Sequence, residues 1–222
     1  MSRRALIVWG GWDGHEPEAV AGVFEELLRA EGFQVAVETS LDAFKDRDRM
    51  RDLDVIVPVW TMGTISTEQL LPLVEAVTSG VGLAGCHGGM CDAFREATEY
   101  QFMTGGQWVA HPGNDAVTYE VRMTGDHWIT RGREAFEVTS EQYYLHVDPS
   151  NTVLAVTRFP IADGPHAPNG PFDMPVVWTR MHGQGRVFYN SLGHTASVLR
   201  HPECLEICRR GLLWAARADS QS

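Results

Sequence analysis

The stretch Gly85-Cys86-His87-Gly88-Gly89 follows the apolar run 81–84 and precedes a segment that can become helical. In a sharp strand-to-helix turn, small residues two positions before and after the key residue leave its side chain exposed at the C-terminal edge of the sheet. Gly85 and Gly89 flank His87 in this way, and small residues also flank Cys86 at positions 84 and 88. The pattern predicts such a turn and leaves open whether it presents an imidazole or a thiol. An ordinary turn with a packed cysteine and a hydrogen-bonded histidine is the structural alternative.

Strands and helices alternate upstream of this turn. Apolar runs at 5–9 and 55–60 predict strands buried on both faces, and alternation at 33–37 predicts a strand nearer an edge. Apolar residues at helical spacing predict helices between these strands, the second opened by a capping-box pattern of Ser66 and Gln69. Gly32 and Gly80 suit the ends of the two helices. Three strand-helix alternations predict a mostly parallel α/β sheet that binds ligands at the C-terminal ends of its strands.

The second half of the chain predicts an antiparallel extension of this sheet. Strand-like patterns occur at 117–123, 136–138, 153–157, 176–181 and 186–190. The segment 160–175 contains seven Pro and Gly residues and is predicted to be a surface loop or lid. A final helix carries Leu205, Cys208, Leu212 and Ala215 on one face. No composition shift divides the chain, so one domain, residues 1–222, is expected.

The composition narrows the class of partner. With 18 Lys and Arg against 29 Asp and Glu, the formal net charge is -11, which argues against nucleic acid and anionic membranes and favours a small molecule. No segment reaches membrane-spanning length, and the N-terminal apolar run lacks a signal-peptide cleavage site. The four cysteines lack zinc-ribbon spacing and are expected to be free thiols in a reducing cytoplasm. The composition leaves open whether the protein forms a homo-oligomer.

Further stretches, together with the turn at 85–89, resemble the ThuA-like (trehalose-utilisation) family over nearly the whole chain. They are Phe94, Asp126–Gly132, Glu141 with Tyr143 or Tyr144, Val177–Thr179, Gly185–Tyr189, Gly193-His194 and Arg210–Ala215. Asp126–Gly132 is similar to a His-Pro-Ile-Thr-x-Gly stretch, with Trp128 in place of the proline. The resemblance implies a flavodoxin-like, class I glutamine amidotransferase-like fold, a three-layer sandwich whose mostly parallel central sheet carries an antiparallel extension. It also implies that His87 is displayed and that Cys86 is packing.

The resemblance implies a role in carbohydrate utilisation, on trehalose, another disaccharide, or a 3-keto sugar derivative made by a partner sugar dehydrogenase. We therefore expect a sugar-modifying enzyme of undefined reaction. One alternative is a non-catalytic sugar-binding or complex-forming protein with an amidotransferase-like fold. A second is a cysteine-dependent amidase or amidotransferase, in which Cys86 would be activated by the His201-Pro202-Glu203 stretch. In the family, however, the corresponding histidine leaves the last core strand, where this chain has His194, and Pro202 and Glu203 suit the first turn of a helix.

Three histidines, His15, His87 and His194, follow predicted core strands. In the predicted fold they converge at one edge of the sheet, where Glu141 and His146 are expected to join them. Imidazoles with a carboxylate can hold a divalent transition metal such as zinc, and they can equally move protons beside the carbonyl group of a sugar. We predict His87, His194 and Glu141 as catalytic residues, and His15, His87 and His194 as metal ligands. Each histidine taken alone is more often structural.

Side chains near the same loops are candidates for holding a sugar. The predicted substrate-binding residues are Trp12, Trp60, Met62, Tyr143 and His146. Tryptophan rings, Trp108 included, can stack on the apolar face of a sugar, although burial is their commoner role. Among the remaining histidines, His111 is expected to join the site from a loop, His127 to cap a turn and His166 to be solvated.

Overall fold

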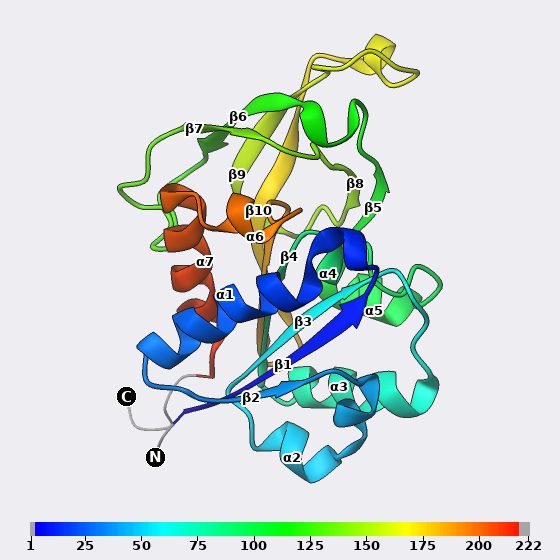
Figure 1. Cartoon of the computed structure of the whole chain (residues 1–222), viewed down its shortest axis with the longest axis vertical. Coiled ribbons are helices and arrows are strands. Elements are labelled where there is room, and N and C mark those ends of the chain that lie inside the picture. Colours follow the sequence, from blue (N-terminus) through cyan, green and yellow to red (C-terminus); the bar gives the residue numbers. More distant parts are fainter. Residues whose placement is uncertain (1–2, 218–222) are drawn as a thin grey trace.

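A nine-stranded sheet runs through the computed structural model, which describes residues 3–217 (Figure 1). The strand order is β2-β1-β3-β4-β11-β10-β9-β6-β7; the first five strands are parallel, and the last four continue the sheet in antiparallel fashion. The strands are β1 (Arg4–Gly11), β2 (Gln34–Glu38), β3 (Val55–Thr61), β4 (Gly82–Cys86), β6 (Thr118–Met123), β7 (Phe136–Thr139), β9 (Thr152–Phe159), β10 (Phe172–His182) and β11 (Gly185–Asn190). A separate sheet pairs β5 (Gly106–Ala110) with β8 (Tyr144–Val147). The predicted α/β fold with a parallel core and an antiparallel extension is confirmed.

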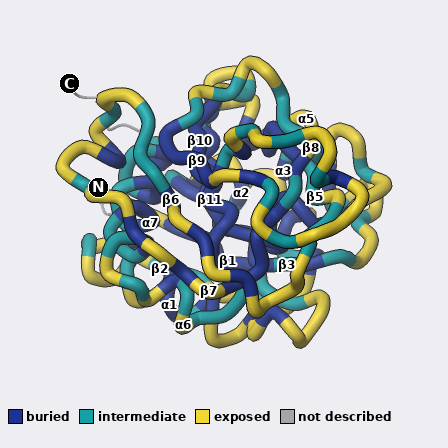
Figure 2. Tube along the Cα trace, turned by 90° about the horizontal axis from the view of Figure 1, so that it is seen from above, coloured by how far each residue is buried: buried dark blue, intermediate teal, exposed yellow. Residues whose placement is uncertain are grey.

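Helices cover both faces of the large sheet, because successive side chains of a strand point to opposite faces. In β1, Ala5 and Ile7 enter one apolar cluster, while Leu6 and Val8 enter the other. The first cluster takes in α1 (Pro17–Ala30), α6 (Ala196–Leu199) and α7 (Pro202–Ala215), and the second takes in α2 (Arg47–Arg51), α3 (Thr67–Thr78), α4 (Gly88–Cys91) and α5 (Thr98–Thr104). Within residues 3–217 there are also four short 3-10 helices: η1 (Asp13–His15), η2 (Leu41–Lys45), η3 (Asn114–Ala116) and η4 (Ala167–Asn169). Figure 2 shows the buried strands surrounded by exposed loops.

The chemistry of the helix ends follows the sequence patterns. At the start of α3, the Ser66 hydroxyl accepts a hydrogen bond from the Gln69 backbone N–H at 3.3 Å, and the Gln69 side chain accepts one from the Ser66 backbone N–H at 2.9 Å. This capping box satisfies two backbone donors that the helix leaves unpaired. Helix α7 begins at Pro202 with Glu203 in its first turn, as predicted. No helix within residues 3–217 is long and apolar enough to cross a membrane.

Regular structure extends further in the second half than the sequence patterns predict. Strand β10 begins at Phe172, so the irregular loop covers 160–171 rather than 160–175. Pro175 fits in this strand because the register of the β9–β10 pairing shifts between Pro175 and Val177, a place where a missing N–H is tolerated. Helix α5 and the β5–β8 sheet match no predicted element, because these segments are short and lack a clear period. Residues 1–2 and 218–222 of the predicted domain lie outside the described part.

Candidate active site and metal centre

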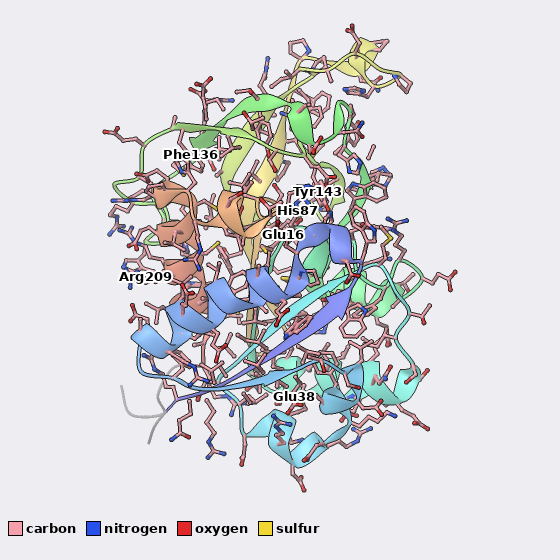
Figure 3. The ribbon with its side chains drawn as sticks, in the orientation of Figure 1. Glu16, Glu38, His87, Phe136, Tyr143 and Arg209 are labelled. Atoms are coloured by element: carbon pink, nitrogen blue, oxygen red, sulfur yellow. The ribbon has the colours of Figure 1, made fainter. Side chains whose placement is uncertain are left out.

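Three histidines and a glutamate meet at the C-terminal edge of the parallel strands. His15 ends η1 just after β1, His87 directly follows β4, and His194 comes four residues after β11. Glu141 reaches them from the segment between β7 and β8. One donor atom from each of the four residues lies within 4.8 Å of all the others. The structure therefore brings together every residue predicted as catalytic or as a metal ligand. Figure 3 shows His87 beside Tyr143 in the middle of the molecule.

The backbone after β4 places the His87 ring in this cluster. A φ of 46° at His87 turns the chain sharply out of the strand and into α4. A Cβ at Gly88 would lie 2.7 Å from both His15 Nδ1 and Thr61 Oγ1, so glycine is needed for the loops to approach. Cys86 is 2% exposed and its sulfur lies against Gly193 in the core. The turn thus directs the imidazole, itself only 1% exposed, toward Glu141 and the thiol into the apolar core.

Glu141 Oε2 lies near a nitrogen of each histidine. It is 3.1 Å from His87 Nε2, 3.3 Å from His194 Nδ1 and 3.6 Å from His15 Nε2. His111, which follows β5, places its Nδ1 3.4 Å from the same oxygen. The Glu141 side chain is only 7% exposed, so these imidazoles replace most of the water that would solvate its charge.

Contacts behind the rings orient two of the histidines. His87 Nδ1 donates a hydrogen bond to the Ser191 carbonyl oxygen at 2.8 Å, which leaves Nε2 to face Glu141. His15 Nδ1 lies 2.9 Å from Thr61 Oγ1, and its Nε2 also faces the carboxylate. A partner on the far nitrogen is typical of metal-ligating histidines, because it fixes the tautomer and the ring orientation.

Burial and the shared carboxylate set the charges in the cluster. Burial lowers the pKa of His87 to about 4, so its imidazole is neutral near pH 7. The Glu141 carboxylate raises the pKa of His194 and outweighs the effect of burial. Burial favours the neutral acid at Glu141, but the imidazoles of His15, His194 and His87 beside its carboxylate together hold its pKa well below its usual range. Glu141 is therefore a buried carboxylate in its ionised form, which requires a cation nearby.

A divalent transition metal fits this set of donor atoms. With metal–ligand bonds of about 2.0–2.2 Å, neighbouring ligand atoms of a tetrahedral zinc site lie about 3.3–3.6 Å apart. The distances from Glu141 Oε2 to the three histidines, 3.1 to 3.6 Å, are close to this range, and all four donor atoms lie within 4.8 Å of one another. His194 Nδ1 is buried without a well-aligned hydrogen-bond partner among residues 3–217, although the carboxylate is near. A metal ion would engage all four donor atoms at once, so the group could hold a metal.

Three members of the cluster, His15, Glu141 and His194, form part of the wall of a hollow of about 460 Å³, whereas His87 is buried and does not line it. Three of the predicted substrate-binding residues, Trp12, Met62 and Tyr143, line this hollow. Trp12 is 46% exposed, so its ring is accessible to a ligand. Trp108 and His111 line the hollow as well, and the Trp108 indole N–H donates to His111 Nδ1 at 3.2 Å. His111 therefore joins the site from a loop, as expected.

Two predicted substrate-binding residues lie outside this hollow. The Trp60 ring packs closely against Gly10 and Gly63 instead of lining the hollow. His146 is exposed on β8, where it follows the buried Leu145. Successive residues of a strand point to opposite faces, so His146 cannot share the orientation of Leu145.

Asp92 and Arg95 line the hollow although no sequence pattern indicated them. Arg95 Nε and Nη2 donate to the Asp92 carboxylate at 2.6 and 3.0 Å, and the guanidinium lies 4.5 Å from the centre of the Trp108 ring. Tyr143 stacks on His87 with ring centroids 3.9 Å apart. The only available signal for Asp92 and Arg95 was their position shortly after the turn at His87. The Asp92–Arg95 ion pair makes this part of the wall polar.

The residues of the amidase alternative have other surroundings. Burial raises the pKa of the Cys86 thiol well above its ordinary value, so it is a poor nucleophile. The His201 ring stacks on Phe136 with centroids 4.7 Å apart, and Glu203 pairs with Arg133 at 3.4 Å. These contacts place His201 and Glu203 at the start of α7 in structural roles.

The other histidines are also accounted for. His127 Nδ1 accepts a hydrogen bond from the Ile129 backbone N–H at 3.2 Å, which agrees with the predicted capping of a turn. His166 is buried and packs against the rings of Tyr144 and Phe159, so the expectation that it is solvated is wrong. Its loop folds back on aromatic residues of β8 and β9, a contact that local sequence does not reveal.

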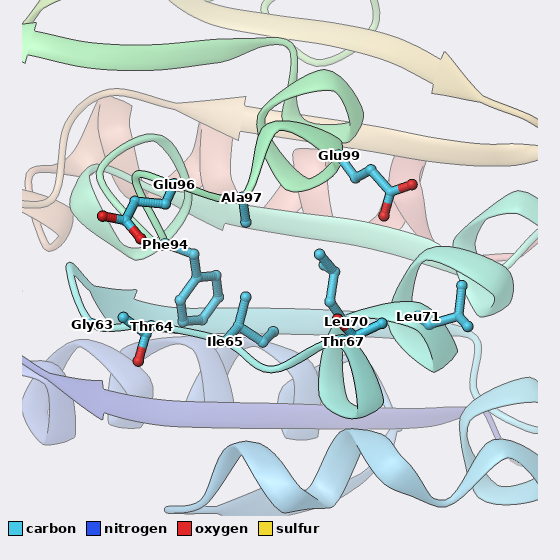
Figure 4. Close-up of a pocket in the computed structure, with 10 residues that line it drawn as sticks. All are labelled: Gly63, Thr64, Ile65, Thr67, Leu70, Leu71, Phe94, Glu96, Ala97 and Glu99. Carbon is cyan, nitrogen blue, oxygen red and sulfur yellow. The ribbon is translucent and has the colours of Figure 1, made fainter.

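Another hollow, of about 310 Å³, lies between the start of α3 and the segment 94–99 (Figure 4). Its walls include Ile65, Leu70 and Leu71 together with the carboxylates of Glu96 and Glu99. It contains no histidine and no residue of the cluster. The hollow beside Glu141 is therefore the candidate active site.

Known proteins resemble this chain in sequence profile and in fold. A ThuA-like protein from Parabacteroides merdae ATCC 43184 has a TM-score of 0.76 at 15% identity, covering 97% of this chain and 90% of that one. A cytoplasmic protein from Salmonella typhimurium LT2 has a TM-score of 0.69 at 13% identity, covering 96% and 100%. A β-galactosidase from Bacillus circulans sp. alkalophilus has a TM-score of 0.62 at 12% identity, covering 96% of this chain but 30% of that one.

Sequence identities this low show that the fold is shared but do not show a shared function. No curated protein matches the sequence at a significant level. The family profile named ThuA and described as trehalose utilisation matches residues 4–215. Because that match spans nearly the whole sequence, the chain belongs to the ThuA (trehalose utilisation) family.

Proposed function

We propose that this protein is an enzyme of carbohydrate utilisation that modifies a disaccharide such as trehalose, or its keto derivative, at the cluster around Glu141. Family membership supports the substrate class. The rings of Trp12 and Trp108 in the same hollow suit the apolar face of a sugar. The observation that carries the proposal is the buried Glu141 carboxylate with four imidazole nitrogens within 3.6 Å, because perturbed titratable groups beside a hollow are typical of active sites.

A divalent transition metal such as Zn²⁺ is the proposed cofactor, held by His15, His87, His194 and Glu141. The donor set and the distances between donor atoms support this assignment. When bound, such an ion polarises a carbonyl oxygen or activates a water molecule. The hydrogen bond from His87 to Ser191 and the contact of His15 with Thr61 keep the two ring nitrogens aimed at the carboxylate.

The cluster also contains an acid and a base of its own. The pKa of His87 is lowered and that of His194 is raised. Environments that separate the pKa values of two groups in this way indicate which group acts as the base and which as the acid. Neutral His87 would act as the proton acceptor, and His194, whose pKa is raised, would act as the donor to a sugar oxygen. Glu141 stabilises the imidazolium in either step. This acid-base version needs no metal, so metal analysis separates it from the first.

Metal content and turnover measured on the same preparations test the proposal. We expect about one transition ion per chain and consumption of 3-keto-trehalose, with both lost in His87→Ala. Cys86→Ala is the matched control, since it alters the neighbouring residue in the core, costs about 1 kcal/mol and should keep both properties. A metal-free wild type that still turns over would favour the acid-base version. Sugar binding with no conversion of trehalose or its keto form would instead indicate a binding protein, and loss of turnover in Cys86→Ala would favour the amidase.

The surroundings of the reaction follow from the same proposal. A cytoplasmic location and a partner sugar dehydrogenase that supplies the keto substrate are part of it. The net charge of -11 supports a small-molecule partner over nucleic acid or an anionic membrane. Whether the enzyme works as a homo-oligomer is answered by its mass in solution.

A further inference from the structure

A second hollow, of about 570 Å³, adjoins the candidate active site. The two hollows share Trp108, His111 and Asn114 as lining residues. The second lies between the segment that follows β5 and the loop 160–171 that joins β9 to β10. Figure 1 shows this loop, in yellow, beyond the green segment after β5. One molecule could therefore extend from the first hollow into the second.

A tight turn separates the two hollows. The Asn114 backbone N–H donates to the His111 carbonyl oxygen at 3.0 Å, and Gly113 and Asn114 have φ values of 89° and 55°. His111 Nδ1 lies 3.4 Å from Glu141 on the side of the first hollow, while Pro112 lines the second. A ligand that spans both hollows would pass the cluster at this turn, so its middle would lie nearest the groups that do chemistry.

The walls of the second hollow are mainly apolar. They carry Val109, Ala110, Pro112 and Pro165 together with the rings of Trp108 and Tyr144. His166, from the loop, is itself buried against Tyr144 and Phe159, and neither of its ring nitrogens has a hydrogen-bond partner among residues 3–217.

A second sugar ring would bring several hydroxyl groups into this space. Apart from His166, the side chains there that can pair with hydroxyls are those of Asn114 and Asp163, besides the ring groups of Trp108, His111 and Tyr144. Hydroxyls that lose water without gaining partners oppose binding, whereas an aryl or alkyl group gains by leaving water. The wall chemistry therefore favours an apolar group over a second hexose.

We infer that the second hollow receives the apolar aglycone of a glycoside whose sugar ring lies beside Glu141. This rests on the proposed function and refines its substrate class: an aryl or alkyl keto-glycoside in preference to a keto-disaccharide. Trp108 borders both parts and is placed to contact the glycosidic link. The hollow thus acts as a specificity subsite.

Paired ligands test this inference. Affinities of the methyl and phenyl glycosides of the same 3-keto-glucose, in both anomers, are measured by calorimetry beside 3-keto-trehalose. We expect the phenyl glycoside to bind at least tenfold more tightly than the methyl glycoside and more tightly than the disaccharide. Equal affinity of phenyl and methyl forms, or a preference for the disaccharide, would overturn the inference while leaving the proposed function intact. No binding by any glycoside would refute the proposed function, and the inference with it.

Two substitutions locate the effect. Val109 is 42% exposed and lies where the β5–β8 pairing is irregular, and Pro165 is exposed on the opposite wall. Because both side chains are exposed, the variants Val109→Asp and Pro165→Asp should fold. Each should remove most of the preference for phenyl and change methyl glycoside affinity less than twofold. Leu71→Asp is the matched control, because Leu71 is 39% exposed in the separate hollow of Figure 4. An undiminished phenyl preference in both variants, or the same loss in Leu71→Asp, would contradict the assignment.

Discussion

Zinc should stabilise this protein against thermal unfolding, and Glu141→Gln should remove that effect. The native cluster offers three imidazole nitrogens and an ionised oxygen within a few ångströms, whereas the unfolded chain separates them over 179 positions, from His15 to His194. An ion that binds only the native state shifts the unfolding equilibrium by mass action. The substitution keeps the shape of the side chain and removes the negative charge.

The expected size follows from binding arithmetic. Free Zn²⁺ at 100 times its dissociation constant stabilises the native state by about 2.7 kcal/mol. For a chain of 222 residues, where 1 kcal/mol shifts the melting temperature by about 2–4 °C, this corresponds to about 5–11 °C. Loss of a residue that only hydrogen-bonds a metal-binding side chain weakens metal binding about 10–100-fold, so loss of the charged group itself should cost at least about 100-fold. At the same Zn²⁺ concentration, the variant should then gain only about 1–2 °C.

Melting curves in buffered free Zn²⁺, recorded after chelator treatment, measure both shifts. Glu137→Gln is the matched control: it removes the same charge from an exposed position on β7, close in sequence to Glu141, and should keep the full shift. A wild-type shift below about 2 °C at saturating Zn²⁺ would refute the metal assignment. An equal shift in Glu141→Gln would show that the ion binds elsewhere.

Two further predictions concern the same cluster. Gly88→Ala should lower the free energy of unfolding in urea by about 1–3 kcal/mol and reduce the rise in melting temperature caused by zinc, because the added Cβ would lie 2.7 Å from His15 Nδ1 and Thr61 Oγ1. Gly22→Ala is the control and should change neither property, because a Cβ added there meets nothing within 4 Å. If Gly88→Ala leaves both properties unchanged, the packing argument fails. In the metal-free protein, the pKa of His87 is about 4 in the folded state and about 6.5 in the unfolded state. The unfolded chain therefore binds this proton more readily, and the free energy of unfolding falls by up to about 3 kcal/mol as the pH drops from about 6.5 to about 4. His194, with a raised pKa, acts in the opposite sense, so the difference between wild type and His87→Gln isolates the effect; a pH dependence that is identical in both would contradict it.

The parallel half of the fold could be predicted because its signals are local. Apolar runs identify β1 and β3, the Ser66 capping box marks the start of α3, and the glycines around His87 mark the turn after β4. Such features depend on neighbours a few residues apart. The β5–β8 sheet could not be found in this way, since its two strands lie far apart in sequence and each is only four or five residues long.

The residues of the site also differ in whether local sequence features predict their positions. His15, His87 and His194 follow parallel strands, so topology alone places them at one edge. Glu141 was indicated by the family resemblance, because nothing near it in sequence shows that it turns back over the edge to a histidine 54 residues away. The position of His146 depends on where β8 begins, and a shift of one residue reverses the face of every side chain in a strand.

The four residues of the cluster come from two parts of the sheet, which has a consequence for how the cluster forms. The histidines belong to the parallel half of the sheet, and the carboxylate is held by the antiparallel extension, where the Tyr119 hydroxyl of β6 donates to the Glu141 carbonyl oxygen at 3.0 Å. Neither half can complete the donor set alone, so a metal ion bound here would link the two halves of one sheet. Its binding energy would then oppose separation of the extension from the core as well as local movement of the loops. Stability gained from metal should accordingly appear in global unfolding, and loss of the ion should loosen β6, β7 and the Glu141 segment relative to β1, β4 and β11.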